Sequence, residues 1–208
     1  MLKELIERYP VLASCEDDIK KAVDAMIACY ERGNKILLCG NGGSCADCDH
    51  IVGELMKGFL KLRPIDESEK ARMKAASPAL DDELLSKLQC GLLAISLPSI
   101  AALNSAFCND VDPELIYAQS LFALAKEGDL LIGLSTSGNA KNVFAAVKVA
   151  KALGVKVIGM TGAKGGKLYE NSDICIRVPE NETFKIQELH LPVYHYLCAA
   201  VEGHFFKS

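Results

Sequence analysis

Short apolar runs alternate with amphipathic helical stretches along most of the chain. Apolar residues recur at helical spacing over 17–32, and Gly33-Asn34 is a typical helix end. Five apolar runs have the length of strands, and they cover 36–39, 92–95, 130–134, 155–160 and 174–178. The last run has fewer apolar residues, which favours an edge strand. Helical patterns cover 45–59, 113–126, 142–153 and 183–206, and Pro192 predicts a kink in the last of these.

Strands that alternate with helices at this spacing indicate a parallel sheet covered by helices on both faces. The chain is therefore expected to form one α/β domain over 1–208. The expected architecture is a three-layer sandwich with a central, mostly parallel, five-stranded sheet and an N-terminal helix. Residues 61–89 interrupt the alternation of strands and helices, because this polar stretch is too long for an ordinary connection between two such elements. We interpret it as an insertion of one or two short helices that folds beside the mouth of the functional pocket.

Composition narrows the class of protein. The chain has 208 residues, of which 50% are hydrophobic and 24% charged, as expected for a folded globular domain. The formal net charge of -4 argues against nucleic acid as a partner, since no basic excess exists to neutralise phosphates. No apolar run is long enough to cross a membrane, and the first residues do not have the pattern of a secretory signal. We therefore expect a cytoplasmic protein without a membrane partner.

The chain contains nine cysteines, an odd number that favours reduced thiols. Cys45 and Cys48 form a lone CxxC pair on a predicted helix. A structural zinc site would need a second pair at suitable spacing, and none follows. We interpret the pair as helix packing, with redox chemistry or zinc binding as the less favoured alternatives.

Two loops with anion-binding character follow predicted strands. Gly40-Asn41-Gly42-Gly43-Ser44 and Ser135-Thr136-Ser137-Gly138-Asn139 each precede a helix, where free N–H groups and hydroxyls can converge on a phosphate. The first loop is a poor dinucleotide fingerprint, since Cys45 stands where a third Gly or Ala belongs. It also lacks the Lys-Ser/Thr ending of a P-loop. A phosphate monoester is the ligand class that these loops favour.

Together with their flanking residues, the loops resemble the SIS (sugar isomerase) family and, within it, the phosphoheptose isomerases. The matching residues run in the family's order over nearly the whole chain: the two loops, Asp47, His50, Glu54, Asn109-Asp110, Thr161-Gly162, Ile186-Gln187-Glu188, His190 and His195. This resemblance implies the SIS fold and ketose–aldose isomerisation of a phosphosugar. The implied reaction converts sedoheptulose 7-phosphate to D-glycero-D-manno-heptose 7-phosphate through an enediol. Ala140 departs from the family's loop, which usually has Ser there.

The spacing of the polar side chains suits this chemistry. His50 and Glu54 are four residues apart and so share one helix face. Gln187 and His195 are eight apart, or about 80° around an ideal helix, so both can border one site. A carboxylate and an imidazole can move protons at carbon and at oxygen, and this N and O ligand set suits zinc. The resemblance implies one zinc held by His50, Glu54, Gln187 and His195, with Glu54 as the base and His195 as the acid.

The resemblance also implies the substrate-binding residues and the assembly. The substrate contacts are Asn41, Gly42, Gly43, Ser44, Glu54, Asn109, Asp110, Ser135, Thr136, Ser137 and Gln187. The implied assembly is a homotetramer with shared active sites. Two alternatives stay open: a non-catalytic regulator that senses phosphosugars or binds the replication initiator DnaA, and an isomerase of another sugar phosphate. The DnaA-binding relative lacks the Glu and the second His, so Glu54 and His195 favour the enzyme.

Overall fold

The computed structural model describes residues 1–206, which contain a five-stranded sheet in the order β2-β1-β3-β4-β5. Every pair of neighbouring strands is parallel. The strands are β1 (Ile36–Cys39), β2 (Ala94–Ser96), β3 (Leu130–Leu134), β4 (Lys156–Thr161) and β5 (Ile174–Arg177). All five predicted strands are confirmed, and β5 is an edge strand as expected. β2 begins two residues late, because the N–H of Leu92 donates to the carbonyl of Leu55 instead of joining the sheet.

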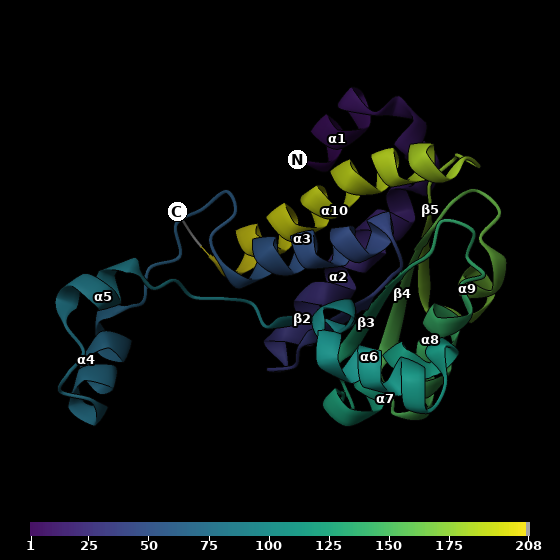
Figure 1. Cartoon of the computed structure of the whole chain (residues 1–208). Helices are drawn as coiled ribbons and strands as arrows, with labels where there is room; N and C mark the ends of the chain where they lie inside the picture. The colour runs from purple at the N-terminus through teal and green to yellow at the C-terminus, as the bar shows by residue number, and fades with distance from the viewer. Residues whose placement is uncertain (207–208) are drawn as a thin grey trace.

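Helices cover both faces of the sheet, which confirms the three-layer α/β sandwich (Figure 1). One face carries α1 (Leu2–Arg8), α2 (Glu16–Glu31), α3 (Gly43–Met56) and α10 (Thr183–Phe205). The other carries α6 (Ala101–Asp110), α7 (Ile116–Leu124), α8 (Lys141–Ala152) and α9 (Gly166–Asn171). Short 3-10 turns η1 (Pro10–Cys15), η2 (Leu97–Ser99) and η3 (Pro113–Leu115) connect these elements.

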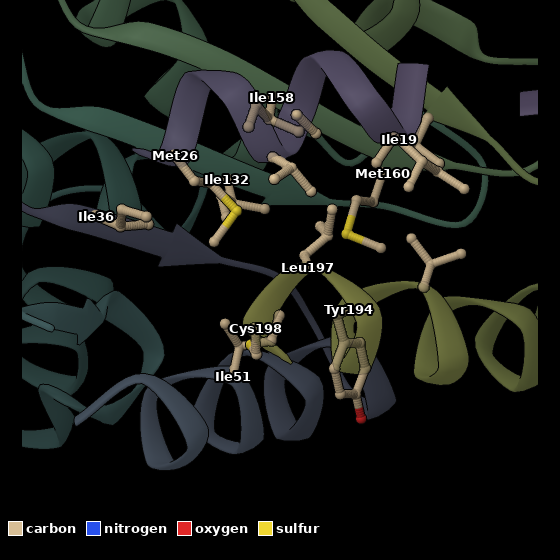
Figure 2. Packing of buried hydrophobic residues seen from close by; sticks show 14 of the residues in the cluster. Ile19, Met26, Ile36, Ile51, Ile132, Ile158, Met160, Tyr194, Leu197 and Cys198 are labelled. Atoms are coloured by element: carbon tan, nitrogen blue, oxygen red, sulfur yellow. The ribbon is translucent and has the colours of Figure 1, made fainter. Parts of the chain in front are cut away.

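The strands supply alternate side chains to two separate cores, because successive residues of a strand point to opposite faces. Ile36 and Ile132 face the layer of α2, α3 and α10, whereas Leu37 and Leu131 face the layer of α7 and α8. Figure 2 shows the first core, in which side chains from α2, α3 and α10 meet those of the sheet. This packing fixes α3 and α10 side by side on one face of the sheet.

The helix boundaries differ from the sequence expectations in several places. The predicted helix 113–126 begins as the 3-10 turn η3, where the Asp112 carboxylate accepts from the N–H of Glu114, and α7 ends at Leu124. The predicted helix 45–59 ends at Met56, since Lys57 is extended. α10 continues as one helix through Pro192. The short helices α6 and α9 were not predicted.

The insertion forms two short helices, α4 (Glu67–Ala76) and α5 (Asp82–Lys87), capped by the side chains of Asp66 and Asp81. Figure 1 shows both helices standing apart from the rest of the chain. The expectation that this segment folds beside the pocket mouth of its own domain was therefore wrong. The insertion is connected to the rest of the domain by a narrow neck, where Pro64 and Gln89 form an antiparallel bridge. Beside it, the N–H of Cys90 donates to the carbonyl of Arg63 at 2.7 Å.

No helix within residues 1–206 is long and apolar enough to span a membrane.

Candidate active site

The two predicted anion-binding loops meet at one edge of the sheet. They follow β1 and β3, which are adjacent parallel strands, so both loops lie at the same carboxyl end. A pocket of about 340 Å³ lies between them. Its lining includes Asn41, Gly42, Gly43, Ser44, Ser135, Thr136, Ser137, Ala140, Thr183 and Gln187. We call this pocket the phosphate cradle, because backbone N–H groups and hydroxyls at helix starts suit a phosphate.

Glycines shape both loops of the phosphate cradle. Gly42 precedes the first residue of α3 with φ of 57°, a conformation that favours glycine. Gly138 has φ of 69°, and a Cβ there would overlap the carbonyl oxygen of Gly165. Ala140 lines the cradle with a methyl group, so it adds no hydroxyl to those of Ser135, Thr136 and Ser137.

Asn41 is held in the cradle by two residues that sequence reasoning missed. Its amide exchanges two hydrogen bonds with the amide of Asn142, at 2.8 and 2.9 Å. The Tyr117 hydroxyl lies 2.7 Å from the carbonyl oxygen of Gly40 and 3.1 Å from Oδ1 of Asn41. Asn142 lies on α8 and Tyr117 on α7, so the first loop is tied to the opposite helical layer.

A second polar group lies where α3 packs against α10. Nε2 of His50 is 3.1 Å from Oε1 of Glu54 and 3.4 Å from Nε2 of His195. We call these three side chains the His-Glu-His cluster. Burial lowers the pKa of His195, the nearby His50 lowers it further, and Glu54 opposes both effects. At neutral pH His195 is therefore an uncharged imidazole.

The two carboxylate oxygens of Glu54 have different neighbours. Oε1 faces His50, whereas Oε2 lies 3.4 Å from Nζ of Lys57. The Glu54 side chain is 14% exposed, so the carboxylate is reachable from solvent but largely covered. One carboxylate oxygen thus faces the histidines, while the other accepts from the exposed Lys57.

The His-Glu-His cluster fits a zinc ion in donor chemistry and in part of its spacing. Two nitrogen ligands about 2.05 Å from a tetrahedral zinc lie about 3.4 Å apart, which matches the distance between the two Nε2 atoms. As placed in the structure, however, no three or more His, Cys, Asp and Glu side chains within residues 1–206 converge so that they could together hold a metal ion. The two Nε2 atoms face each other beside the Glu54 carboxylate, so either a proton on one of them or a cation between them satisfies the three groups.

Gln187 lies with the phosphate cradle, at the opposite end of the α3–α10 contact from His195. A Cβ at Gly43 would lie only 2.5 Å from Nε2 of Gln187, so the amide rests directly on the start of α3. Eight residues of helix rise about 12 Å, which places Gln187 and His195 well apart along α10. The structure thus brings together three of the four predicted zinc ligands.

Asn109 and Asp110 lie at the end of α6 and are exposed. Their side chains bond to each other, with Nδ2 of Asn109 donating to Oδ1 of Asp110 at 2.8 Å. Neither residue lines the phosphate cradle of its own chain.

Two further predicted residues are buried. His190 is fully buried and lies 3.4 Å from the carbonyl oxygen of Thr161, and burial lowers its pKa to about 4. Cys48 is also fully buried, and burial raises the thiol pKa of both Cys45 and Cys48. Protonated thiols of this kind are poor nucleophiles and poor metal ligands, which supports the packing interpretation of the CxxC pair.

An apolar groove of about 430 Å³ opens beside the His-Glu-His cluster. Residues from α1, α10 and the connection after α3 line it, among them Leu5, Tyr9, Phe59, Leu191 and His195. The Phe59 and His195 rings pack with their centroids 5.6 Å apart. The groove therefore brings apolar surface directly to one member of the cluster.

The chain is similar to known proteins in both sequence and structure. Residues 3–90 and 102–200 each match a family model described as SIS domain. The phosphoheptose isomerase of Aneurinibacillus thermoaerophilus is 37% identical over 190 residues, which covers 91% of this chain and 83% of that protein. The Burkholderia pseudomallei phosphoheptose isomerase is 38% identical over 188 residues, covering 90% and 82%. The structure of a phosphoheptose isomerase from Francisella tularensis superimposes with a TM-score of 0.77 at 30% identity, covering 97% of this chain and 94% of that one.

Proposed function

This chain belongs to the phosphoheptose isomerase family of SIS-domain proteins, and we propose on that premise that it isomerises sedoheptulose 7-phosphate to D-glycero-D-manno-heptose 7-phosphate. The observation that carries the proposal is the pairing of two sites on α3. The helix begins in the phosphate cradle at Gly43 and carries His50 about two turns later and Glu54 about three turns later. The start of α3 can hold a phosphate, while the side chains further along the helix can transfer protons.

The separation of the two sites favours a long sugar. Gly43 is seven residues from His50 and eleven from Glu54, or about 10 and 16 Å along α3. An extended chain gains about 1.25 Å per C–C bond, so C2 and the phosphorus of a heptose 7-phosphate lie about 9 Å apart. A pentose 5-phosphate spans only about 6 Å by the same count, so the heptose phosphate reaches further from the phosphate cradle toward Glu54.

The proton transfers follow from the chemistry of the cluster. Glu54 takes the proton from C1 of the ketose and returns it to C2 of the enediol. His195, as a neutral imidazole, gives its ring proton to the oxygen on C2 as the enediol forms, and takes the hydroxyl proton from the oxygen on C1 as the aldehyde forms. The phosphate cradle holds the far end of the sugar, so the reacting carbons stay against Glu54 through both steps.

We also propose that His50, Glu54 and His195 hold a zinc ion, with Gln187 as the expected fourth ligand. Zinc at this point supplies a positive charge that polarises the sugar oxygens. The fit of the donor atoms supports this assignment, whereas the position of Gln187 beside Gly43 requires its side chain to turn along α10.

We propose a homotetramer with shared active sites. Asn109 and Asp110 lie outside the phosphate cradle of their own chain, so a neighbouring copy is needed if they are to contact substrate. The apolar groove beside His195 supports an interface at the same end of the site. We place the protein in the cytoplasm, because all nine cysteines are free thiols in the structure. We treat residues 61–89 as an insertion within one domain spanning the chain.

Incubation of the purified protein with sedoheptulose 7-phosphate tests the function. Parallel reactions contain fructose 6-phosphate and ribulose 5-phosphate, and NMR of the products identifies the aldose. We expect turnover of the heptulose phosphate and little with the shorter sugars. The Glu54→Gln variant, purified identically, controls for contaminating isomerases. Binding of the heptulose phosphate without conversion would instead favour a phosphosugar sensor, and turnover of a shorter sugar would favour a different isomerase.

A further inference from the structure

Behind His50, on the side away from Glu54, lies a short chain of hydrogen bonds that the proposed reaction does not use. Nδ1 of His50 is 3.0 Å from the hydroxyl oxygen of Tyr194. That hydroxyl in turn lies 3.2 Å from Oδ1 of Asp47. Tyr194 is only 1% exposed, and its ring packs edge-on against the His50 imidazole at 5.4 Å. Asp47 lies one turn before His50 on α3, whereas Tyr194 comes from α10.

The direction of these hydrogen bonds is set by the carboxylate. An ionised carboxylate only accepts, so the single phenolic hydrogen of Tyr194 goes to Asp47. The tyrosine oxygen then offers a lone pair to His50, whose Nδ1 must carry the hydrogen. The opposite arrangement would leave Asp47 without a donor at Oδ1, and its Oδ2 is already buried without a partner. Leaving a buried carboxylate unsatisfied on both oxygens is costly.

This arrangement matters because the other tautomer of His50 is also stabilised by a hydrogen bond. With the hydrogen on Nε2, His50 would donate to Oε1 of Glu54, which lies 3.1 Å away. That bond would occupy both the nitrogen and the oxygen that the cluster offers to a cation. A group on the far side of the ring is therefore needed to keep the Nε2 lone pair free.

We propose that Asp47 and Tyr194 are positioning residues that hold His50 with its proton on Nδ1, so that the Nε2 lone pair faces Glu54 and His195. The proposal rests on the proposed function only in naming zinc as the cation that this lone pair receives. Partners that fix the tautomer of a ligating histidine raise metal affinity, and their loss typically costs about 10- to 100-fold.

The test reads the tautomer directly, in protein labelled with ¹⁵N-histidine and freed of metal by a chelator. The chain has four histidines, so substitution of each in turn assigns the ring resonances. At pH 8 the wild type should show a protonated Nδ1 and an unprotonated Nε2 at His50. Tyr194→Phe, which removes only the hydroxyl, should give a mixture or the reversed tautomer. Asp47→Asn provides a second variant that reaches the same tautomer shift should Tyr194→Phe not fold.

Zinc affinity is measured on the same proteins by competition with a chelating dye. We expect Tyr194→Phe to bind zinc about 10- to 100-fold more weakly than the wild type. Tyr196→Phe is the matched control, since Tyr196 lies two residues further along α10 outside this chain of hydrogen bonds. A wild-type His50 protonated at Nε2 would overturn the proposal. So would a Tyr194→Phe protein with the wild-type tautomer and a zinc affinity equal to that of Tyr196→Phe. The tautomer is read without substrate, so a failure of the isomerase assay would leave this result standing.

Discussion

The guanidinium of Arg63 and the carboxylate of Glu202 form an ion pair that is closed off from solvent. Their side chains are 0% and 1% exposed, and Nε of Arg63 donates to Oε1 of Glu202 at 2.9 Å. Arg63 also donates to the carbonyl oxygens of Leu55 and Glu54, at 2.6 and 3.1 Å. These carbonyls belong to the last turn of α3, so the pair joins the helix that carries Glu54 to the helix that carries His195.

Removal of one partner from this ion pair should be strongly destabilising. Arg63→Met keeps an apolar stem but leaves Glu202 buried without its counter-charge, so we expect a loss of about 3–5 kcal/mol in the free energy of unfolding. Lys141→Met is the control, because Lys141 pairs with Glu114 at the surface and should contribute less than about 1 kcal/mol. Urea unfolding monitored by circular dichroism measures both. Equal effects would contradict the role assigned to the buried pair.

Glu54→Gln should abolish most of the turnover and leave the fold unchanged. The replacement is nearly isosteric but cannot accept the proton from carbon, so turnover should fall at least ~100-fold. Circular dichroism and the unfolding midpoint check the fold, and the NMR assay with sedoheptulose 7-phosphate measures the rate. Lys57→Gln, which removes the neighbour of the same carboxylate, should have a much smaller effect. Near-normal turnover in Glu54→Gln would remove Glu54 from the mechanism.

Gly43→Ala should weaken substrate binding without unfolding the protein. A Cβ at this position meets the amide end of Gln187, which is flexible enough to move away. Displacement of one hydrogen-bonding group from the cradle, worth about 1.4 kcal/mol, should raise KM about tenfold. Gly53→Ala on the same helix is the control, since nothing lies within 4 Å of the added methyl. If both variants have the same KM, Gln187 does not contribute to the cradle.

The sheet was predictable because buried parallel strands are uninterrupted apolar runs. Ile36–Cys39 and Leu130–Leu134 are fully buried, and their boundaries coincide with the predicted runs. The apolar pattern did not predict helices that have few buried residues. α6 has no buried residue, so no periodic apolar face marks it in the sequence.

The functional residues were predictable only as far as local spacing and family resemblance reach. His50 and Glu54 are neighbours on one helix turn, and the loops carry the family's motif. The contacts of Arg63 with Glu202 and of His50 with Tyr194 join residues 139 and 144 positions apart. They arise from the packing of α3 against α10, which no local pattern encodes. The angular argument for Gln187 did not include the rise along the helix, and the structure places its amide beside Gly43, while its role as a ligand stays a prediction.

His190 should make stability depend on pH in a specific window. Burial lowers its pKa to about 4 from about 6.5 in the unfolded chain, so the unfolded state binds the proton first as pH falls. The stabilisation is present above pH 6.5, and about 3 kcal/mol of it should be lost by pH 4. His190→Leu should flatten this part of the curve relative to wild type, and the exposed His204→Gln should not. Chemical unfolding at half-unit pH steps measures the difference, and parallel curves for wild type and His190→Leu would contradict the assignment.

The projecting segment 65–88 should be removable without loss of the fold. Its ends are held together at the neck by the bridge between Pro64 and Gln89, so a two-residue Asn-Gly turn can join them. α4 has no buried residue, the one buried residue of α5, Leu85, belongs to neither core, and neither helix lines the phosphate cradle, so the core should be undisturbed.

The shortened chain should unfold at or above the wild-type midpoint, because a shorter loop costs less closure entropy. A deletion of 63–90 also removes Arg63, so its free energy of unfolding should fall by about 3–5 kcal/mol. This second deletion is the comparison for the first. Turnover of sedoheptulose 7-phosphate by the shortened chain should match the wild type, since Figure 1 places both helices away from the rest of the domain. Loss of turnover with the fold intact would contradict this expectation and would mean that the segment reaches the active site of another copy.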